Sequence, residues 1–138
     1  MAAAAMNDGG QDPIATVLVV EDEVLIRLAT AEYLRECGYR VVEVASGDEA
    51  QAVLQAGLAV DVVFTDVMMP GAFNGFALAR WVRDTHPEIR VILTSGVQRT
   101  AQDAQDLCES KEDFMDKPYV HSEVADRIKA LLARATRG

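Results

Sequence analysis

Short apolar runs alternate with segments of helical period from residue 16 onward, and the alternation repeats five times. This pattern is typical of βα units wound around a parallel sheet. The runs predict strands at residues 17–20, 40–44, 60–65, 91–94 and 113–115. The first, third and fourth runs are almost purely apolar, as in strands covered by helices on both faces, so we expect them at the centre of the sheet. The second run has charged residues and is expected at an edge.

The segments between the strands carry helical signals. Val24, Leu28, Ala31 and Leu34 form an apolar stripe that predicts a first helix with these four residues facing the core. The stripe stops at Gly38, since glycine readily adopts the left-handed conformation at a helix end.

Four further helices are predicted. The second opens at a capping box formed by Ser46 and Glu49 and ends at Gly57. The third spans residues 75–85, and the fourth, at about 98–108, is mostly polar and should bury little surface. In the last helix, apolar residues repeat at helical spacing, namely Val120, Val124, Ile128 and Leu131.

Composition and charge limit the functions open to this chain. Its 138 residues fit one domain, expected at 15–138 after a disordered tail at 1–14. With 13 Lys and Arg against 22 Asp and Glu the net charge is −9, which argues against direct DNA binding because phosphate backbones require a basic surface. No apolar run approaches the roughly 20 residues of a membrane span, so no membrane insertion is expected. Two distant cysteines, Cys37 and Cys108, predict no disulfide framework and fit a reducing, cytoplasmic location.

Reactive side chains follow the predicted strands where each strand ends. The first is followed by Glu21, Asp22 and Glu23, the third by Asp66, the fourth by Ser95 and the fifth, after one further residue, by Lys117. In an open parallel sheet these carboxyl ends form the ligand-binding edge. Clustered carboxylates repel one another unless a cation joins them, and oxygen ligands favour Mg²⁺. Asp66 could then accept a phosphoryl group as the nucleophile. Lys117 and Mg²⁺ would act as charge clamps, and Ser95 would donate its hydroxyl.

This arrangement resembles the receiver domain of two-component response regulators. The likeness rests on four segments in order: VLVVEDE (17–23), VFTDVMMPG (63–71), VILTSG (91–96) and DKPY (116–119). It implies a flavodoxin-like (βα)₅ doubly wound α/β fold with strand order 2-1-3-4-5.

The resemblance also implies roles for individual residues. Asp66 would take its phosphoryl group from a histidine kinase or a histidine phosphotransfer protein. Glu21, Asp22, Asp66 and the main-chain carbonyl of Met68 would hold Mg²⁺, and Lys117 would match the family's invariant lysine. Pro118 would follow Lys117 in a cis peptide.

The expected switch consists of one hydroxyl residue and one aromatic residue. Thr94 and Ser95 both offer a hydroxyl, and the family's spacing favours Ser95; Phe114 falls at the position of the switch aromatic. Phosphorylation would then change contacts with a downstream effector protein, and a weak homodimer is compatible with the likeness. Because no output domain follows the last helix, we expect a stand-alone receiver that catalyses only its own phosphorylation and dephosphorylation.

Other readings stay open. A phosphorelay intermediate or a phosphate sink would use the same chemistry, whereas a degenerate receiver would dock to partners without phosphorylation. A small aspartyl-phosphate phosphatase is disfavoured, because it normally has a second aspartate where this chain has Met68. Residues 71–76 make the loop beside Asp66 one residue longer than the common pattern.

Overall fold

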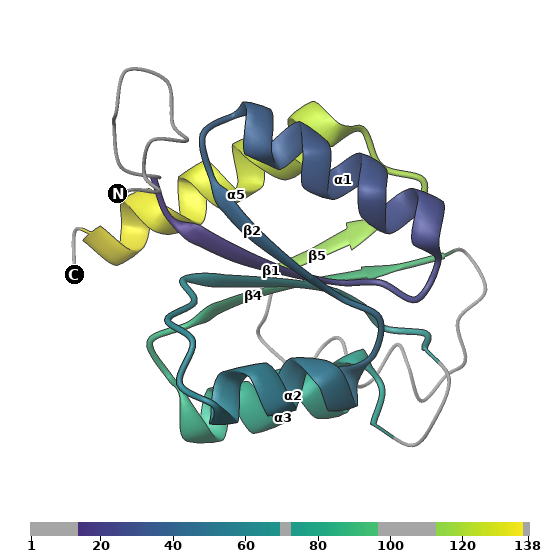
Figure 1. The fold of residues 1–138 in the computed structure, drawn as a ribbon. Coiled ribbons are helices and arrows are strands. Elements are labelled where there is room, and N and C mark those ends of the chain that lie inside the picture. The colour runs from purple at the N-terminus through teal and green to yellow at the C-terminus, as the bar shows by residue number, and fades with distance from the viewer. Residues whose placement is uncertain (1–13, 70–72, 97–112, 137–138) are drawn as a thin grey trace.

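The computed structural model describes residues 14–69, 73–96 and 113–136, and these form one parallel five-stranded sheet flanked by helices (Figure 1). The strands are β1 (Thr16–Val20), β2 (Arg40–Val44), β3 (Val62–Asp66), β4 (Arg90–Ser95) and β5 (Asp113–Asp116). The helices are α1 (Val24–Glu36), α2 (Gly47–Gln55), α3 (Gly75–Thr85) and α5 (His121–Thr136). The strand order is β2-β1-β3-β4-β5, so the predicted flavodoxin-like order is confirmed, with β2 at an edge.

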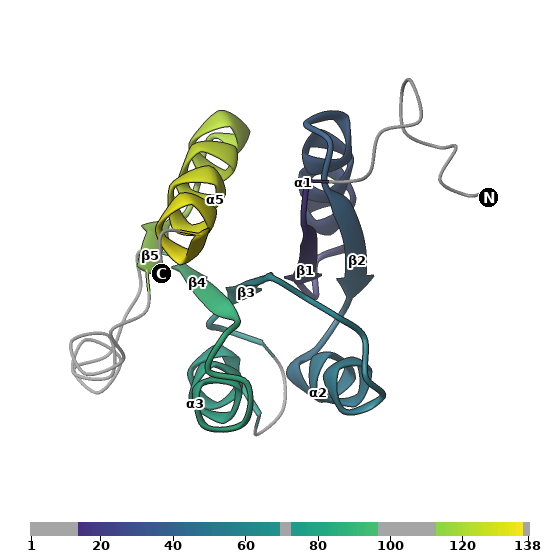
Figure 2. The ribbon, with the colours of Figure 1, turned by 90° about the vertical axis from the view of Figure 1, so that its left-hand side faces the viewer.

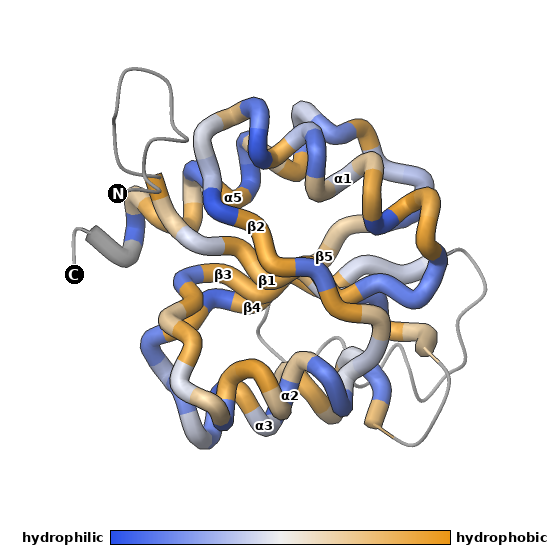
Figure 3. Tube along the Cα trace, in the orientation of Figure 1, coloured by the Kyte–Doolittle hydropathy of each residue, from blue (hydrophilic) through white to orange (hydrophobic). Residues whose placement is uncertain are grey.

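The helices cover both faces of the sheet. Figure 2 shows α1 and α5 on one face and α2 and α3 on the other. Side chains alternate along each strand, so Leu18 and Val20 pack toward α2 and α3 while Val17 and Val19 pack toward α1 and α5. The sheet is therefore apolar throughout its centre, as the hydropathy colouring shows (Figure 3).

The third strand differs from the prediction at its start. It begins at Val62 rather than residue 60, and Asp61, the residue before it, bonds the start of β1 through both its backbone and its carboxylate. The backbone N–H of Asp61 donates to the carbonyl of Thr16 at 2.9 Å, and its carboxylate accepts from the Thr16 N–H at 2.9 Å. Asp66 is the last residue of the strand, which places its side chain at the carboxyl edge.

The predicted buried stripe of the first helix is wrong at two of four positions. Ala31 and Leu34 are buried, but Val24 is 53% exposed and Leu28 is 45% exposed. Thr30 is buried in their place, because α1 turns this residue toward the chain that leads into α5. Val120 is likewise exposed, since it precedes α5 instead of packing within it.

The helix ends follow the predicted signals. Gly38 and Gly57 have positive φ angles of 102° and 98°, and Ser46 Oγ accepts from the Glu49 N–H at 3.1 Å. Helix α3 has the predicted bounds, with Asn74 Oδ1 accepting from the Ala77 N–H at 3.0 Å.

Some sequence predictions lie outside the described residues. These are the helix at 98–108, residues 70–72 of the loop after β3, and the tail at 1–14 apart from Ile14, whose N–H donates to the Gly38 carbonyl at 3.1 Å. Among the helices in the described part of the chain, none has the length and apolar character needed to cross a membrane.

Candidate functional site

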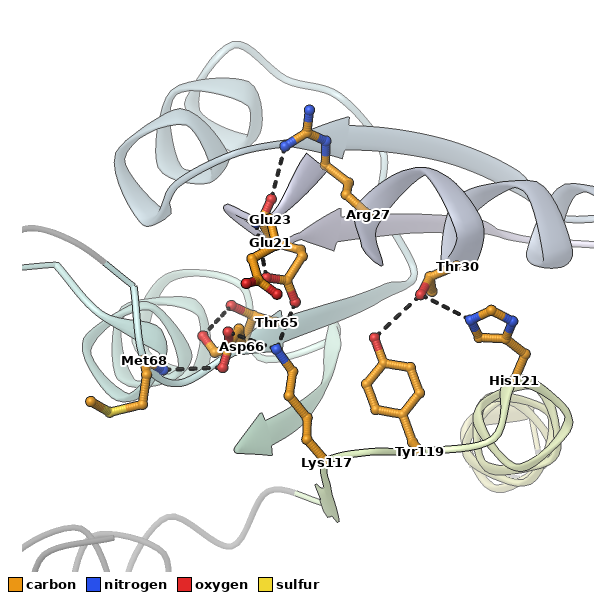
Figure 4. A network of polar contacts seen from close by, with 10 residues as sticks. All are labelled: Glu21, Glu23, Arg27, Thr30, Thr65, Asp66, Met68, Lys117, Tyr119 and His121. Carbon is orange, nitrogen blue, oxygen red and sulfur yellow. Dashed lines mark hydrogen bonds and ion pairs between the residues drawn. The ribbon is translucent and has the colours of Figure 1, made fainter. Parts of the chain in front are cut away.

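Three strands deliver an acidic cluster and one lysine to the carboxyl edge of the sheet. Glu21 follows β1, Asp66 ends the neighbouring β3, and Lys117 follows β5. Lys117 Nζ lies 2.9 Å from Glu21 Oε1 and 2.9 Å from Asp66 Oδ2, so one ammonium bridges two carboxylates (Figure 4). The predicted convergence of these side chains is confirmed.

The cluster carries more negative than positive charge. Glu21, Asp22 and Asp66 each offer a carboxylate oxygen, and these three atoms lie within 4.8 Å of one another. Glu21 and Asp66 are buried, and Asp22 is half-buried. Three carboxylates against one ammonium leave two unneutralised negative charges. An all-oxygen set with this charge fits a hard divalent cation such as Mg²⁺, which binds through one or two carboxylates and retains several waters.

Burial shapes the protonation of the three bridged groups. Burial raises the pKa of Asp66, although the hydrogen bond from Lys117 opposes the shift. Burial also raises the pKa of Glu21, although the hydrogen bond from Lys117 acts to lower it. For Lys117, burial disfavours the charged form, but hydrogen bonds from Nζ to Glu21 and Asp66 outweigh it and raise the lysine pKa well above its ordinary value. The lysine therefore stays charged at neutral pH.

Backbone hydrogen bonds fix the two buried carboxylates. The Met68 N–H donates to Asp66 Oδ1 at 3.2 Å, and the Glu23 N–H donates to Glu21 Oε2 at 3.1 Å. Each acid thus uses one oxygen for a turn amide and the other for Lys117. The remaining lone pairs of these carboxylate oxygens, which face the cluster, are available to bind a cation.

A close backbone approach supports Asp66 from behind. A Cβ atom added at Gly75, the first residue of α3, would lie 2.4 Å from the Asp66 carbonyl oxygen. The Gly75 N–H also donates to the Val67 carbonyl at 3.0 Å. The start of α3 therefore rests directly on the turn that carries the Asp66 carboxylate.

The two candidate switch hydroxyls both lie at the buried end of β4. Thr94 pairs with Asp66 in the β3–β4 register, and Ser95 Oγ donates to the Gly96 carbonyl at 3.3 Å. The choice of Ser95 stays a prediction, as does the switch role of Phe114, which is half-buried on the α2 and α3 face. The Lys117–Pro118 peptide is cis, as expected, and the Lys117 N–H donates to the Ser95 carbonyl at 2.7 Å.

Two sets of contacts around this site were not predicted from the sequence. Arg27 Nη1 donates to the main-chain carbonyl of Glu21 at 2.9 Å (Figure 4). Thr30 Oγ1 lies 3.2 Å from the Tyr119 hydroxyl and 3.4 Å from His121 Nε2, which ties α1 to the chain after Lys117. The Arg27 contact could not be foreseen, because a basic residue one turn into a helix gives no local signal of its partner. The Thr30 contacts could not be foreseen because they join residues about 90 positions apart.

Comparison with known proteins identifies the class that this sheet and acidic edge define. The family model for the response regulator receiver domain matches residues 17–129. The chain belongs to this family of two-component signalling domains. The resemblance seen in the four sequence segments is thereby confirmed.

Individual relatives span different amounts of sequence. The chain is 38% identical over 121 residues to the sensor kinase CckA of Brucella abortus, covering 87% of this chain but 13% of that protein. It is 34% identical over 116 residues to the two-component response regulator ORR3 of rice, covering 83% of this chain and 88% of that protein. The signal receiver domain of a histidine kinase from Syntrophus aciditrophicus superposes with a TM-score of 0.80 at 30% identity, covering 90% and 94% of the two chains.

Proposed function

We propose that this receiver accepts a phosphoryl group on Asp66 from the phosphohistidine of a histidine kinase or a histidine phosphotransfer protein. The observation that carries the proposal is the Lys117 ammonium placed 2.9 Å from Asp66 Oδ2 inside a cluster of three carboxylates. An ammonium in that position can bind an incoming phosphoryl oxygen without leaving the acceptor. The modified protein then signals through contacts with a downstream effector protein.

In the transfer, an Asp66 carboxylate oxygen attacks phosphorus as the bond from phosphorus to the donor imidazole nitrogen breaks. The electron pair of that bond stays on the imidazole, and the product is an aspartyl phosphate. Mg²⁺, held by Glu21, Asp22, Asp66 and the Met68 carbonyl, would supply charge neutralisation for the phosphoryl oxygens. Lys117 supplies a second positive charge, and Ser95 supplies a hydroxyl donor to the phosphoryl group.

Exposed apolar side chains beside the acidic residues support a protein as the donor. Leu25 is 80% exposed and Val24 is 53% exposed, and both follow the acidic loop directly at the start of α1. Met68, two residues after Asp66, is also exposed and its side chain extends away from the cluster (Figure 4). Exposed apolar surface next to polar groups is typical of sites that bind another protein.

The proposed donor, a histidine kinase, takes its phosphoryl group from intracellular ATP. We therefore expect this receiver to act in the cytoplasm. The reactive groups serve the chain's own carboxylate, so we class the protein as a self-modifying switch and not as an enzyme with a separate substrate.

The first test is intact mass after incubation with acetyl phosphate, with and without Mg²⁺, for wild type and Asp66→Ala. Asp61→Ala is the matched control, because Asp61 directly precedes the same strand, at the end opposite to Asp66. One added phosphoryl group that requires Mg²⁺ and Asp66 but not Asp61 is expected. A folded wild type that stays unmodified would instead favour a receiver that docks without phosphorylation. A protein that is phosphorylated but shows no change in partner affinity would favour a relay intermediate or a phosphate sink.

A further inference from the structure

Arg27 connects the metal-site loop to the neighbouring edge strand. It lies in the second turn of α1, and its side chain is only 17% exposed. One guanidinium nitrogen, Nη1, donates to the Glu21 main-chain carbonyl at 2.9 Å, and another, Nε, lies 3.5 Å from Glu43 Oε1 on β2. The rigid guanidinium fork therefore makes both contacts at once.

The Glu21 carbonyl is a sensitive point in this loop. It shares one planar peptide unit with the N–H of Asp22, so a rotation of that carbonyl also moves the Asp22 backbone. The other groups of Glu21 are already fixed: the N–H donates to the Val44 carbonyl at 3.1 Å, and the carboxylate contacts Glu23 and Lys117. The Arg27 contact adds a restraint on the peptide that joins the two acidic residues.

Glu43 gives Arg27 a firm anchor. Glu43 pairs with Val19 in the β1–β2 register, and its second oxygen, Oε2, accepts from Arg35 Nη1 at 3.0 Å. The carboxylate is thus held by the sheet and by a second arginine. Arg27 consequently transmits the position of the sheet to the acidic loop.

We propose that Arg27 is a positioning residue for the divalent-cation site, holding the peptide between Glu21 and Asp22 so that both carboxylates face Asp66. The inference rests on the proposed function, since it assigns Arg27 to the site that would bind Mg²⁺. Arg27 acts through the Glu21 backbone and does not itself touch the cation or the phosphoryl group.

Geometry and charge predict opposite effects when Arg27 is removed. A positive side chain near a cation site repels the cation, so loss of charge alone should tighten Mg²⁺ binding. Loss of the backbone restraint should weaken it, because groups that orient metal ligands typically contribute about 10-fold to 100-fold in affinity. The sign of the change therefore separates the two explanations.

Arg35 provides the matched control within the same helix. It also pairs with Glu43, and its Nη2 donates to the carbonyl of Val41, six residues along the chain, at 3.0 Å. Arg27 and Glu21 are likewise six residues apart. Val41, however, is near the start of β2, so Arg35→Gln removes the same charge and an equivalent backbone bond while leaving Arg27 its own contacts with the Glu21 carbonyl and Glu43 Oε1.

The experiment is calorimetric titration of the full chain with Mg²⁺, without any phosphodonor. We expect Arg27→Gln to weaken Mg²⁺ binding by about tenfold, as for an outer ligand-orienting group, and Arg35→Gln to leave it equal or slightly tighter. Arg27→Lys keeps the charge but cannot reach both partners with separate nitrogens, so it should also bind Mg²⁺ more weakly than wild type. Unchanged or tighter binding by Arg27→Gln, or wild-type binding by Arg27→Lys, would overturn the inference.

A second readout excludes a general loss of structure. Phosphorylation by acetyl phosphate is followed against Mg²⁺ concentration, and Arg27→Gln should shift the half-saturating Mg²⁺ upward while reaching the wild-type plateau at high Mg²⁺. A lower plateau at unchanged half-saturation would contradict a positioning role. If Arg27→Gln does not fold, Arg27→Lys carries the same test. A wild type that binds no Mg²⁺ and is never phosphorylated would refute the proposed function itself, whereas a working wild type with indifferent Arg27 variants would refute this inference alone.

Discussion

Gly75→Ala tests whether the start of α3 fixes Asp66, the proposed phosphoryl acceptor. Helix propensity alone predicts that this change stabilises the protein by about 0.5–1 kcal/mol, because alanine restricts the unfolded chain more than glycine. The structure predicts the opposite sign. A Cβ at this position would lie 2.4 Å from the Asp66 carbonyl oxygen and 2.7 Å from the Val67 Cα, and both are backbone atoms.

The size of the effect follows from the space that is missing. Real Cβ atoms essentially never come within 3.0 Å of such neighbours, so α3 and the Asp66 turn must separate by about 0.6 Å. Neither side can rotate away, as a flexible side chain would. Forcing an extra methyl group into a well-packed site costs about 1–3 kcal/mol, which exceeds the propensity gain. Because the displaced atoms belong to Asp66 and Val67, phosphorylation should slow as well.

The assay is urea unfolding without Mg²⁺, paired with the rate of phosphorylation by acetyl phosphate. Ala77→Gly, in the same turn of α3, calibrates helix propensity at this end of the helix. If the steric clash dominates, both variants are less stable than wild type. If helix propensity alone acts, Gly75→Ala is more stable and Ala77→Gly is less stable than wild type. A Gly75→Ala protein that is as stable as wild type and is phosphorylated at the same rate would refute the reasoning.

Three further predictions concern the acidic site. Because burial raises the pKa of Asp66 above its ordinary value of 3.8 despite the Lys117 contact, its ionised form destabilises the metal-free fold. Asp66→Asn should therefore raise the urea midpoint at neutral pH. This gain in stability should shrink as pH falls through the raised pKa of Asp66 and vanish below about 3.8. A gain in stability that grows in acid would contradict this sign. Lys117→Met leaves two buried carboxylates unpaired and should cost about 3 kcal/mol in urea unfolding without Mg²⁺, with part of the loss recovered by adding Mg²⁺; equal losses with and without the ion would argue against a cation site. Met68→Asn should speed loss of the phosphoryl group severalfold, since an amide can orient the attacking water where the thioether cannot; unchanged decay in a phosphate-affinity gel would rule this out.

The sheet could be predicted because its strands are nearly continuous apolar runs. Buried parallel strands leave a strong signal, and the acidic and basic residues that follow them had to meet at one edge once the strands were parallel. The order of those strands came from the family resemblance, not from the apolar pattern. The capping residue Ser46 marks a helix start through a local hydrogen bond, which a short stretch of sequence can specify.

Helix orientation was predicted less well, for a physical reason. In α1, apolar residues lie on more than one side, so periodicity could not tell the buried Ala31 from the exposed Leu28. Thr30 is buried because Tyr119, 89 positions away, places a hydroxyl within 3.2 Å of it. The role of Arg27 was missed for the same reason, since its partner Glu43 lies on another element. These contacts depend on the assembled fold, and no local pattern encodes them.

The bridging lysine also has a consequence for biosynthesis. Lys117 lies 96 positions after Glu21 and 51 after Asp66, so both acids leave the ribosome well before the residue that neutralises them. An incomplete chain can carry β1 and β3 but cannot place an ammonium between their carboxylates. The bridged site is therefore complete only when β5 has joined the sheet, so under the proposed function a nascent or truncated product lacks the ammonium that would receive the phosphoryl group.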